Sequence, residues 1–332
     1  MDNLRTVERA LDELKRGYAV CLRDGNATLR VMAAEYAGAQ PGPLRVVLSG
    51  QRANYLGLGA QAISVKIPVG DGTLLQSLLY APCVETTIQA TPASSGERMA
   101  LGLIKQAGFL PAALISAPDN SAALEVSAEA AEAYLKRPVV LALDTLVRLP
   151  VAAYEDTRVA TFEERGGAVH LALLIGHPEN EAAPLARLHS SCFTGEILES
   201  LRCDCGSQLR EAIEVMAKAG GGVLLYLNQE GRGIGLINKL RAYHLQEQGL
   251  DTVEANLALG FAEDERDFAI AAQMLRILKI GKIRLLTNNP HKVEALTQAG
   301  IAVAERVPLV VKPGEHNRDY LAAKAKKMGH RH

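Results

Sequence analysis

Short apolar runs alternate with helical patterns along the first half of the chain. Residues 7–14 carry apolar side chains three to four positions apart, which is the spacing of one helical face. Residues 19–22 and 44–48 are short apolar runs of the kind that form buried strands. Residues 99–107 predict another helix, and the glycine directly after them marks its end. Strands that alternate with helices predict an α/β domain that ends near residue 118.

The second half shows the same alternation around a glycine-rich loop. Residues 169–175 and 185–190 predict apolar strands, and residues 207–219 predict an amphipathic helix. Residues 223–227 predict a buried strand that leads into the loop 229–235. We therefore expect an α/β (α+β) protein of two domains. A ligand site is expected after this strand, since α/β sheets bind ligands at the carboxyl ends of their strands.

The stretch between the two halves is more polar. Residues 121–136 are rich in alanine and glutamate and predict a surface helix, and residues 139–149 predict a strand. Residues 154–158 and 163–167 form a polar passage before the second domain. A chain of 332 residues also suggests two domains, because one hydrophobic core rarely grows beyond about 250–300 residues. We place the first domain at residues 1–120, a connecting segment at 121–155 and the second domain at 156–332.

Composition excludes several classes of protein. The net charge of −1 gives no footprint for a nucleic-acid backbone, and aromatic residues are only 4% of the chain, so base stacking is not expected. No apolar run approaches the ~20 residues that span a membrane, and the charged residues 1–10 do not form a signal peptide. The basic tail 312–332 predicts a solvated terminal helix. We expect a cytoplasmic protein that binds neither nucleic acid nor membrane.

Three of the five cysteines, Cys192, Cys203 and Cys205, lie within fourteen residues, whereas Cys21 and Cys83 are isolated. An odd number of clustered cysteines suits a reducing compartment better than a disulfide framework. Three thiols with no fourth ligand nearby are typical of a hydrolytic zinc site with one open position. A structural zinc closed by a distant histidine, or reduced cysteines that are neighbours by chance, are the alternatives.

The glycine-rich loop is a second candidate for chemistry. Gly231, Gly233 and Gly235 alternate with other residues, which matches neither the dinucleotide-binding nor the P-loop pattern. Glu230 and Arg232 flank the first glycine, and a helix is expected directly after the loop. Because helix N-termini and arginine forks bind anions, this arrangement favours a nucleotide loop over a plain glycine turn.

A set of motifs, in order along the second half, carries a specific resemblance. They are Arg187-Leu188-His189-Ser190, Cys192, Arg202-Cys203-Asp204-Cys205-Gly206, Gln229-Glu230-Gly231-Arg232, Asp251-Thr252-Val253-Glu254-Ala255-Asn256, Asp264-Glu265-Arg266 and Leu286-Thr287-Asn288-Asn289-Pro290. With them, residues 185–330 resemble GTP cyclohydrolase II, the zinc enzyme that opens riboflavin biosynthesis. The resemblance implies a mixed sheet with flanking helices. It also implies conversion of GTP to 2,5-diamino-6-ribosylamino-4(3H)-pyrimidinone 5′-phosphate, formate and diphosphate.

The resemblance also implies roles for individual residues. The three clustered cysteines would hold zinc, which lowers the pKa of a bound water for attack on C8 of the guanine. Asp264 matches the acid that serves this water, and its alternative is a solvated surface carboxylate. Tyr243 matches a tyrosine near C8, or is a half-buried core tyrosine. Arg266 matches the proposed nucleophile at the α-phosphorus, although a clamp on the α-phosphate is simpler for a guanidinium, which stays protonated.

Further positions match the family's contacts to GTP. They are Arg187, His189, Ser190, Gln208, Glu230, Gly231, Arg232, Thr252, Thr287 and Lys292. Magnesium is expected with the triphosphate, and the resemblance implies a homodimer. Two positions beside the site depart from the family pattern: Ser191 is usually acidic, and Asn228 is usually basic.

The first half resembles 3,4-dihydroxy-2-butanone-4-phosphate synthase, in residues 7–22 and 105–112. That enzyme needs several acidic residues after its first strand to hold magnesium, and a histidine near a later helix. Here Asp24 is the one carboxylate in that loop, and residues 1–169 contain no histidine. The first half is therefore predicted to be a degenerate relative without this activity.

Three other functions stay open on the sequence. A bifunctional riboflavin enzyme would need the missing acidic loop and histidine. A GTP-binding regulator without turnover would not need Asp264, Arg266 and all three clustered cysteines. A paralogous cyclohydrolase of another purine or pyrimidine pathway is compatible with Ser191 and Asn228.

Overall fold

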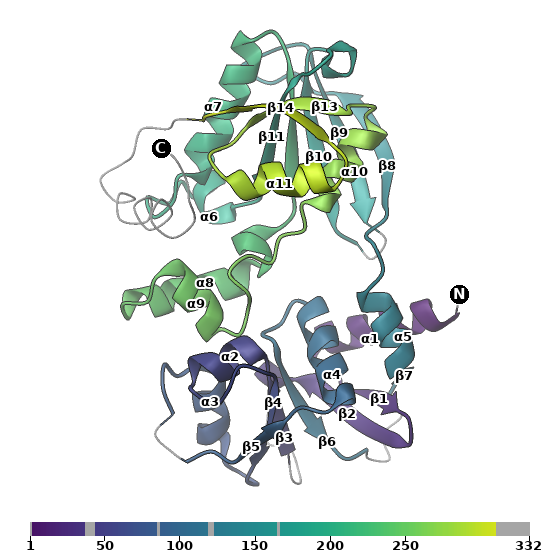
Figure 1. The fold of residues 1–332 in the computed structure, drawn as a ribbon, viewed down its shortest axis with the longest axis vertical. Coiled ribbons are helices and arrows are strands. Elements are labelled where there is room, and N and C mark those ends of the chain that lie inside the picture. Colours follow the sequence, from purple (N-terminus) through teal and green to yellow (C-terminus); the bar gives the residue numbers. More distant parts are fainter. Residues whose placement is uncertain (1, 37–43, 85–86, 119–122, 165–166, 310–332) are drawn as a thin grey trace. The chain divides into compact units, whose positions relative to one another are not determined.

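The chain forms two compact units in the computed structural model, which describes residues 2–36, 44–84, 87–118, 123–164 and 167–309 (Figure 1). The first unit joins residues up to Pro138 with a later segment, Ile237–Glu265. The second unit takes Val139–Leu236 and the chain from Arg266 onward. The boundaries of these two units differ from those of the predicted domains, 1–120 and 156–332. The predicted domain ranges stay a prediction. The expected terminal helix in 312–332 lies outside the described residues.

The first unit is built on a seven-stranded sheet with the order β5-β4-β3-β6-β2-β1-β7. Its strands are β1 (Val20–Asp24), β2 (Ala27–Ala33), β3 (Leu44–Leu48), β4 (Ile63–Ile67), β5 (Ala90–Pro92), β6 (Ala112–Ser116) and β7 (Glu125–Ser127). Its helices are α1 (Asp2–Lys15), α2 (Gly50–Tyr55), α3 (Gly72–Tyr80), α4 (Ser95–Gln106), α5 (Ala128–Leu135), α8 (Leu236–Glu247) and α9 (Thr252–Ala258), with a short 3-10 turn η1 (Ala34–Tyr36).

Local sequence explains much of this unit. Helix α4 starts where Ser94 and Glu97 form a reciprocal capping box, which satisfies two backbone N–H groups. Strands β1 and β2 form a hairpin whose turn uses Gly25 at a φ of 59°. Apolar faces of α1, α4 and α5 pack on the sheet in one core. The α/β class predicted for this half is confirmed.

Residues 27–29 open β2, because the hairpin turn after β1 is confined to two residues. One expectation in this half was only partly correct. The helix expected on the surface at 121–136 is α5, and its alanines Ala128, Ala130 and Ala131 are buried against the core. Because alanine side chains are small, the backbone of such a helix can pack closely on its neighbours. One face of α5 is therefore buried although its sequence is only weakly hydrophobic.

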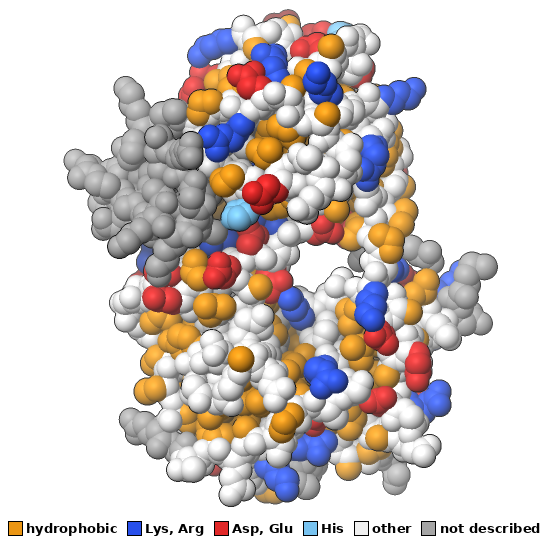
Figure 2. All heavy atoms as spheres, viewed as in Figure 1, with side chains coloured by type: hydrophobic (Ala, Val, Ile, Leu, Met, Phe, Trp, Pro, Cys, Tyr) orange, Lys and Arg blue, Asp and Glu red, His pale blue; other side chains and the backbone are white. Residues whose placement is uncertain are grey.

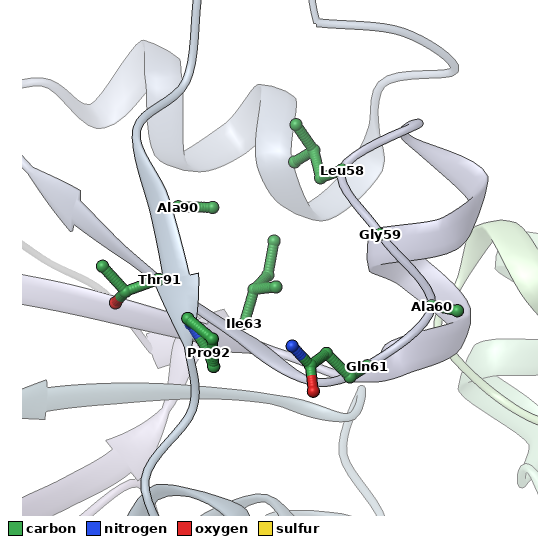
Figure 3. A pocket seen from close by; sticks show the side chains of 8 residues that line it. All are labelled: Leu58, Gly59, Ala60, Gln61, Ile63, Ala90, Thr91 and Pro92. Carbon is green, nitrogen blue, oxygen red and sulfur yellow. The ribbon is translucent and has the colours of Figure 1, made fainter.

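A cavity of about 420 Å³ opens at the β4–β5 edge of the first unit (Figure 3). Leu58, Ile63, Ala90 and Pro92 contribute apolar surface, and the remaining lining residues carry no charge. The lining residues therefore provide no charged side chain that could bind a sugar phosphate.

The second unit contains another seven-stranded sheet, with the order β14-β13-β11-β12-β10-β9-β8. Its strands are β8 (Leu141–Arg148), β9 (Thr157–Glu164), β10 (Val169–Ile175), β11 (Leu185–Ser190), β12 (Gly222–Leu227), β13 (Lys282–Leu286) and β14 (Ala302–Val307). Its helices are α6 (Phe193–Glu196), α7 (Cys205–Lys218), α10 (Ala269–Ile277) and α11 (Pro290–Gln298), with 3-10 turns η2 (Pro178–Asn180) and η3 (Glu230–Gly233). Strand β9 joins the two polar stretches 154–158 and 163–167, and the residues Ala160 and Phe162 between them are buried.

The second sheet is mixed, as the resemblance implied. Strands β14, β13, β11 and β12 are parallel to their neighbours in the sheet, whereas β12, β10, β9 and β8 pair antiparallel. Helices α10 and α11 pack on one face of the sheet, and α7 packs on the other. Because side chains alternate along a strand, Ala186 and Leu188 enter the α10–α11 core while Arg187 and His189 face the α7 side. The carboxyl ends of the four parallel strands therefore lie at the same edge, where α6 and α7 follow β11.

Among the described residues, no helix is both long and apolar enough to cross a membrane. On the face that Figure 2 shows, acidic and basic side chains are interspersed over both units.

Candidate functional site

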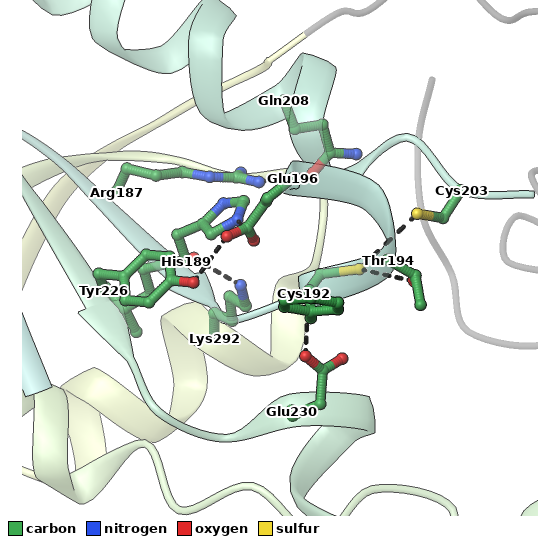
Figure 4. A network of polar contacts seen from close by, with 12 residues as sticks. Arg187, His189, Cys192, Thr194, Glu196, Cys203, Gln208, Tyr226, Glu230 and Lys292 are labelled. Carbon is green, nitrogen blue, oxygen red and sulfur yellow. Dashed lines mark hydrogen bonds and ion pairs between the residues drawn. The ribbon is translucent and has the colours of Figure 1, made fainter. Parts of the chain in front are cut away.

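The three clustered cysteines come together at the carboxyl edge of the second sheet. Figure 4 shows two of them, Cys192 and Cys203. Cys192 follows β11 and precedes α6, Cys203 lies in the loop before α7, and Cys205 is the first residue of α7. Their Sγ atoms all lie within 4.8 Å of one another, and those of Cys192 and Cys203 are 3.7 Å apart. Two thiolates on one tetrahedral zinc are separated by about 3.8 Å, since Zn–S bonds measure ~2.3 Å. The cluster therefore fits one zinc ion.

Two glycines make the cluster possible. A Cβ at Gly195 would lie 2.4 Å from Cys203 Sγ and 3.2 Å from Cys192 Sγ. A Cβ at Gly206 would lie 2.1 Å from the carbonyl oxygen of Gly195, because α6 and the start of α7 pack backbone against backbone. Contact with Cys192 raises the pKa of the Cys203 thiol. A bound cation would offset the repulsion between two such thiolates.

A buried chain of hydrogen bonds runs from β11 to the loop between the cysteines. Arg187 donates through Nη1 to the carbonyl of Leu286 (3.1 Å) and through Nη2 to Gln208 Oε1 (2.6 Å). Gln208 in turn donates to Asp204 Oδ2 (2.5 Å), between two of the cysteines. Burial lowers the pKa of Arg187 to about 10, against the opposing effects of Cys205 and Asp204, so the guanidinium stays charged at neutral pH.

His189 belongs to a second buried network beside the cysteines (Figure 4). Its Nε2 lies 2.9 Å from Glu196 Oε1, and Tyr226 donates its hydroxyl to Glu196 Oε2 at 2.6 Å. Burial lowers the pKa of His189. Burial acts to raise the pKa of Glu196, but hydrogen bonds from His189 and Tyr226 lower it. Because an ionised carboxylate only accepts, Nε2 carries the hydrogen, and Nδ1 of the neutral ring is an acceptor.

Several buried polar atoms at this edge have no hydrogen-bond partner among the described residues. They are Arg187 Nε, His189 Nδ1, Ser190 Oγ, Ser191 Oγ, Gln229 Oε1 and Arg232 Nη1. They come from β11, from the residue that follows it, and from the glycine-rich loop 229–235 after β12. Buried donors and acceptors are costly when unpaired, so this concentration indicates the place of a polar ligand.

The glycine-rich loop departs from ordinary backbone geometry. Gly231 and Arg232 have φ values of 62° and 61°, and Gly233 and Gly235 are also in the left-handed region. A non-glycine residue in that region costs roughly 1–3 kcal/mol and occurs most often at functional sites. Glu230 accepts from the backbone N–H of Phe193 at 2.7 Å, which ties the loop to the start of α6.

The start of α11 closes the same edge of the second unit. Asn289 caps the helix through the N–H of His291, and Thr287 Oγ1 accepts from the N–H of Asn289. Lys292 is buried and donates to the carbonyl of Leu188 at 2.7 Å. The ring of Phe268 lies between two cations, with Arg266 Cζ at 4.9 Å and Lys292 Nζ at 5.6 Å from its centroid.

The structure thus brings most predicted site residues together in the second unit. Gathered at this edge are Arg187, His189, Ser190, Cys192, Cys203, Cys205, Gln208, Glu230, Gly231, Arg232, Arg266, Thr287 and Lys292. Three predicted residues belong to the first unit instead: Tyr243 on α8, Thr252 at the start of α9 and Asp264 after it.

Sequence reasoning missed Glu196, Tyr226, Asp204 and Phe268 as members of this site. Tyr226 carried a signal, since a single hydroxyl in the apolar run 223–227 needs a buried partner. Nothing in the local pattern pointed to Glu196 or Phe268, because Glu196 accepts from the distant Tyr226 and Phe268 lies near the distant Lys292.

Comparisons with known proteins agree with this geometry. The sequence model of the family described as GTP cyclohydrolase II matches residues 144–308. A protein of Azospirillum brasilense named GTP cyclohydrolase-2 is 38% identical over 98% of this chain and 94% of its own length. GTP cyclohydrolase-2 proteins of Aeromonas hydrophila and Cronobacter sakazakii are each 57% identical, over 51% and 53% of this chain and 86% and 89% of their own lengths.

One solved structure, a two domain 3,4-dihydroxy-2-butanone 4-phosphate synthase from A. baumannii, covers 92% of this chain and 99% of its own at 17% identity. Its TM-score is 0.32, so this likeness carries no weight. The Azospirillum relative matches both halves of the chain. The residues matched by the family model, 144–308, include the three clustered cysteines. The chain belongs to the GTP cyclohydrolase II family.

Proposed function

We propose that this protein hydrolyses GTP to 2,5-diamino-6-ribosylamino-4(3H)-pyrimidinone 5′-phosphate, formate and diphosphate, the first step of riboflavin biosynthesis. The observation that carries the proposal is the cluster of three cysteine Sγ atoms within 4.8 Å, beside buried polar atoms without partners, on a chain of this family. A pure GTP-binding regulator would have no need for such a cluster. We also propose a cytoplasmic homodimer that takes GTP with magnesium.

Cys192, Cys203 and Cys205 would hold the zinc ion. A zinc ion bound there would supply a water of lowered pKa for opening the imidazole ring at C8. The soft Cys₃ donor set supports zinc rather than magnesium at this position. Asp264 is proposed to exchange the proton of that water, and Tyr243 is proposed to lie near C8, both by their match to the family motif.

The triphosphate is proposed to bind at the carboxyl edge of the second sheet. Arg187 and Lys292 are buried cations there, and the backbone of Gly231 and Arg232 offers N–H groups in left-handed geometry. Ser190 and Thr287 are proposed to supply hydroxyls, and Gln208 holds Arg187. Thr252 is proposed as a further contact to GTP by its match to the family motif. Glu230 is proposed to accept hydrogen bonds from the guanine, as its carboxylate already does from Phe193.

His189 requires a different partner from the one its motif suggests. A neutral ring whose Nε2–H donates to Glu196 presents only an acceptor at Nδ1. We propose that Nδ1 accepts from a hydroxyl, such as one on the ribose, and that phosphate oxygens are bound by the cations instead.

Arg266 is proposed to clamp the α-phosphate rather than to attack it. A guanidinium has no free lone pair at neutral pH, whereas planar N–H donors fit a phosphate with developing charge. A covalent guanylyl adduct on the protein, sought by intact mass measurement during turnover, would contradict the clamp.

Purified protein incubated with GTP, Mg²⁺ and zinc tests the proposal directly. Formate and the pyrimidine product should appear together, one for one. No product from wild-type protein with full zinc content would overturn the proposed function. Ribulose 5-phosphate in a parallel assay should give nothing, and any dihydroxybutanone phosphate would show that the first half is active.

A further inference from the structure

Three proposed site residues, Tyr243, Thr252 and Asp264, lie in the segment Ile237–Glu265, which belongs to the first unit. It contains α8, α9 and the turn that leads from α9 to Asp264. By its contacts this segment belongs to the first unit, with the sheet formed by the N-terminal half. The groups that hold it there are specific and buried.

Arg52 on α2 is the central group. It is 3% exposed and donates only to backbone carbonyls: Nε to Leu78 (2.8 Å), Nη1 to Ala258 (2.6 Å), and Nη2 to Ser77 and Ala81 (3.1 and 2.7 Å). Ala258 is the last residue of α9, and the other three carbonyls lie at the end of α3. These are the carbonyls that helices leave unpaired, at the negative end of the helix dipole. One guanidinium therefore caps two helices and joins α9 to the N-terminal fold.

The turn after α9 is seated on α2 as closely as the backbone allows. Ser49, the N-cap of α2, donates its hydroxyl to the carbonyl of Gly260 at 2.7 Å. Gly260 has a φ of +87°, and a Cβ there would lie 2.8 Å from Ser49 Oγ and 3.3 Å from Arg52 Cβ. Only glycine satisfies both the backbone angle and this approach. Asp264 follows four residues later in the chain.

Two ion pairs hold the segment near its two ends. Arg241 on α8 pairs with Glu35, which also accepts from the N–H of Leu110. Lys105 on α4 pairs with Glu265 at 2.7 Å, directly beside Asp264 in the sequence. Glu265 further accepts from the N–H of Ala262, so the same carboxylate shapes the turn before Asp264.

We infer that the N-terminal half positions the segment 237–265 for the cyclohydrolase reaction, with Arg52 as the main positioning residue. This rests on the proposed function, since it assigns Thr252 and Asp264 to GTP and its chemistry. On this inference the N-terminal half has a structural role that does not require a catalytic activity of its own. Without these contacts the end of α9 and the turn to Asp264 lose their fixed conformation, and both GTP binding and turnover suffer.

Full-length, zinc-loaded Arg52→Met, Arg52→Lys and Lys105→Met proteins test this. Arg137→Met is the matched control: it removes a guanidinium of the same unit that pairs with Glu8 and stacks on Tyr134, away from the segment. Four quantities are measured: bound zinc, amide hydrogen exchange in residues 252–265, KM for GTP, and kcat. Lys105→Met removes one half-exposed ion pair and keeps the proposal testable if Arg52→Met does not fold.

We expect Arg52→Met to keep its zinc, to exchange faster at residues 252–265, to raise KM and to lower kcat/KM by up to about a hundredfold. Arg52→Lys should recover part of this loss, and Lys105→Met should lose severalfold, while Arg137→Met matches wild type. A merely unstable protein would lose active molecules without a change in KM. Unchanged KM and exchange in both Arg52→Met and Lys105→Met would overturn the inference. If Arg52→Met exchanges faster at residues 252–265 but the wild type never turns over GTP, the proposed function alone would be rejected.

Discussion

Two buried arginines show how differently the two units use the same group. Arg52 in the first unit and Arg187 in the second are 3% and 6% exposed, and burial lowers the pKa of each to about 10. All three nitrogens of Arg52 donate to carbonyls. Arg187 uses two nitrogens on protein acceptors, and its Nε has no partner among the described residues.

The difference distinguishes a structural cation from one that we propose to bind a ligand. A buried charge is tolerated only when hydrogen bonds replace water, and every nitrogen of Arg52 has an acceptor from its own fold. Arg187 has an incomplete set, at an edge where His189, Ser190 and Ser191 are also incompletely paired. We propose that the second unit keeps these polar groups for a substrate, whereas the first unit uses its own to hold the segment 237–265 in place.

The strongest test of the comparison removes a cysteine from the second unit. We expect Cys203→Ser to lose its zinc and to hydrolyse GTP below detection, because two thiolates and a hydroxyl hold zinc poorly. Metal analysis and the formate assay measure both effects. Cys83→Ser, at an exposed and isolated cysteine of the first unit, is the control and should match wild type. Full activity in Cys203→Ser would mean that the zinc assignment is wrong.

A glycine substitution should have nearly as large an effect. In Gly195→Ala the new Cβ would lie 2.4 Å from Cys203 Sγ, so the cluster must spread, and we expect zinc affinity to fall at least about tenfold. Competition with a chelator measures the affinity. Gly72→Ala is the matched control, since nothing lies within 4 Å of a Cβ there. Equal zinc affinity in the two variants would show that the cradle at Gly195 has no role in metal binding.

Exchanging each arginine for methionine sharpens the comparison directly. Arg187→Met should lower kcat/KM by about 10²–10³-fold, the usual cost of removing one donor to a developing charge, while exchange at residues 252–265 stays as in wild type. Arg52→Met should instead accelerate that exchange. Steady-state kinetics and hydrogen exchange on the same preparations distinguish the two. Identical exchange profiles would remove the distinction drawn here.

The pH dependence of stability should also differ between the units. The folded-state pKa of His189 is lowered by burial, so the unfolded chain binds its proton more readily. Stability from the neutral ring is then present above the unfolded value of about 6.5 and is lost as the pH falls below it. Urea unfolding of zinc-loaded protein from pH 8 to pH 5 measures this. His189→Gln should flatten the slope; an unchanged slope would exclude His189 as its source.

The smallest effect is expected at Arg232. Arg232→Gly relieves a left-handed backbone and should leave stability unchanged or raise it by about 1 kcal/mol, while KM for GTP rises. Thermal unfolding and kinetics measure the two quantities. A stability loss would mean that the Arg232 side chain supports the fold rather than the substrate.

The sequence by itself determined the elements and the chemistry that local pattern encodes. Alternating apolar runs predicted most strands, and the spacing of Cys192, Cys203 and Cys205 indicated one metal site before any geometry was known. The glycine-rich loop was also visible, since residues with positive φ must mostly be glycine. These features depend on neighbours in the chain, so sequence reasoning reaches them.

Tertiary structure decided what depends on distant partners. Glu196 is defined by His189 and by Tyr226, thirty residues away, and Arg52 by carbonyls up to 206 residues away. No local pattern encodes such pairs, because a buried polar side chain takes its meaning from the acceptors that folding brings to it. For the same reason, the grouping of Ile237–Glu265 with the N-terminal half was invisible in the sequence.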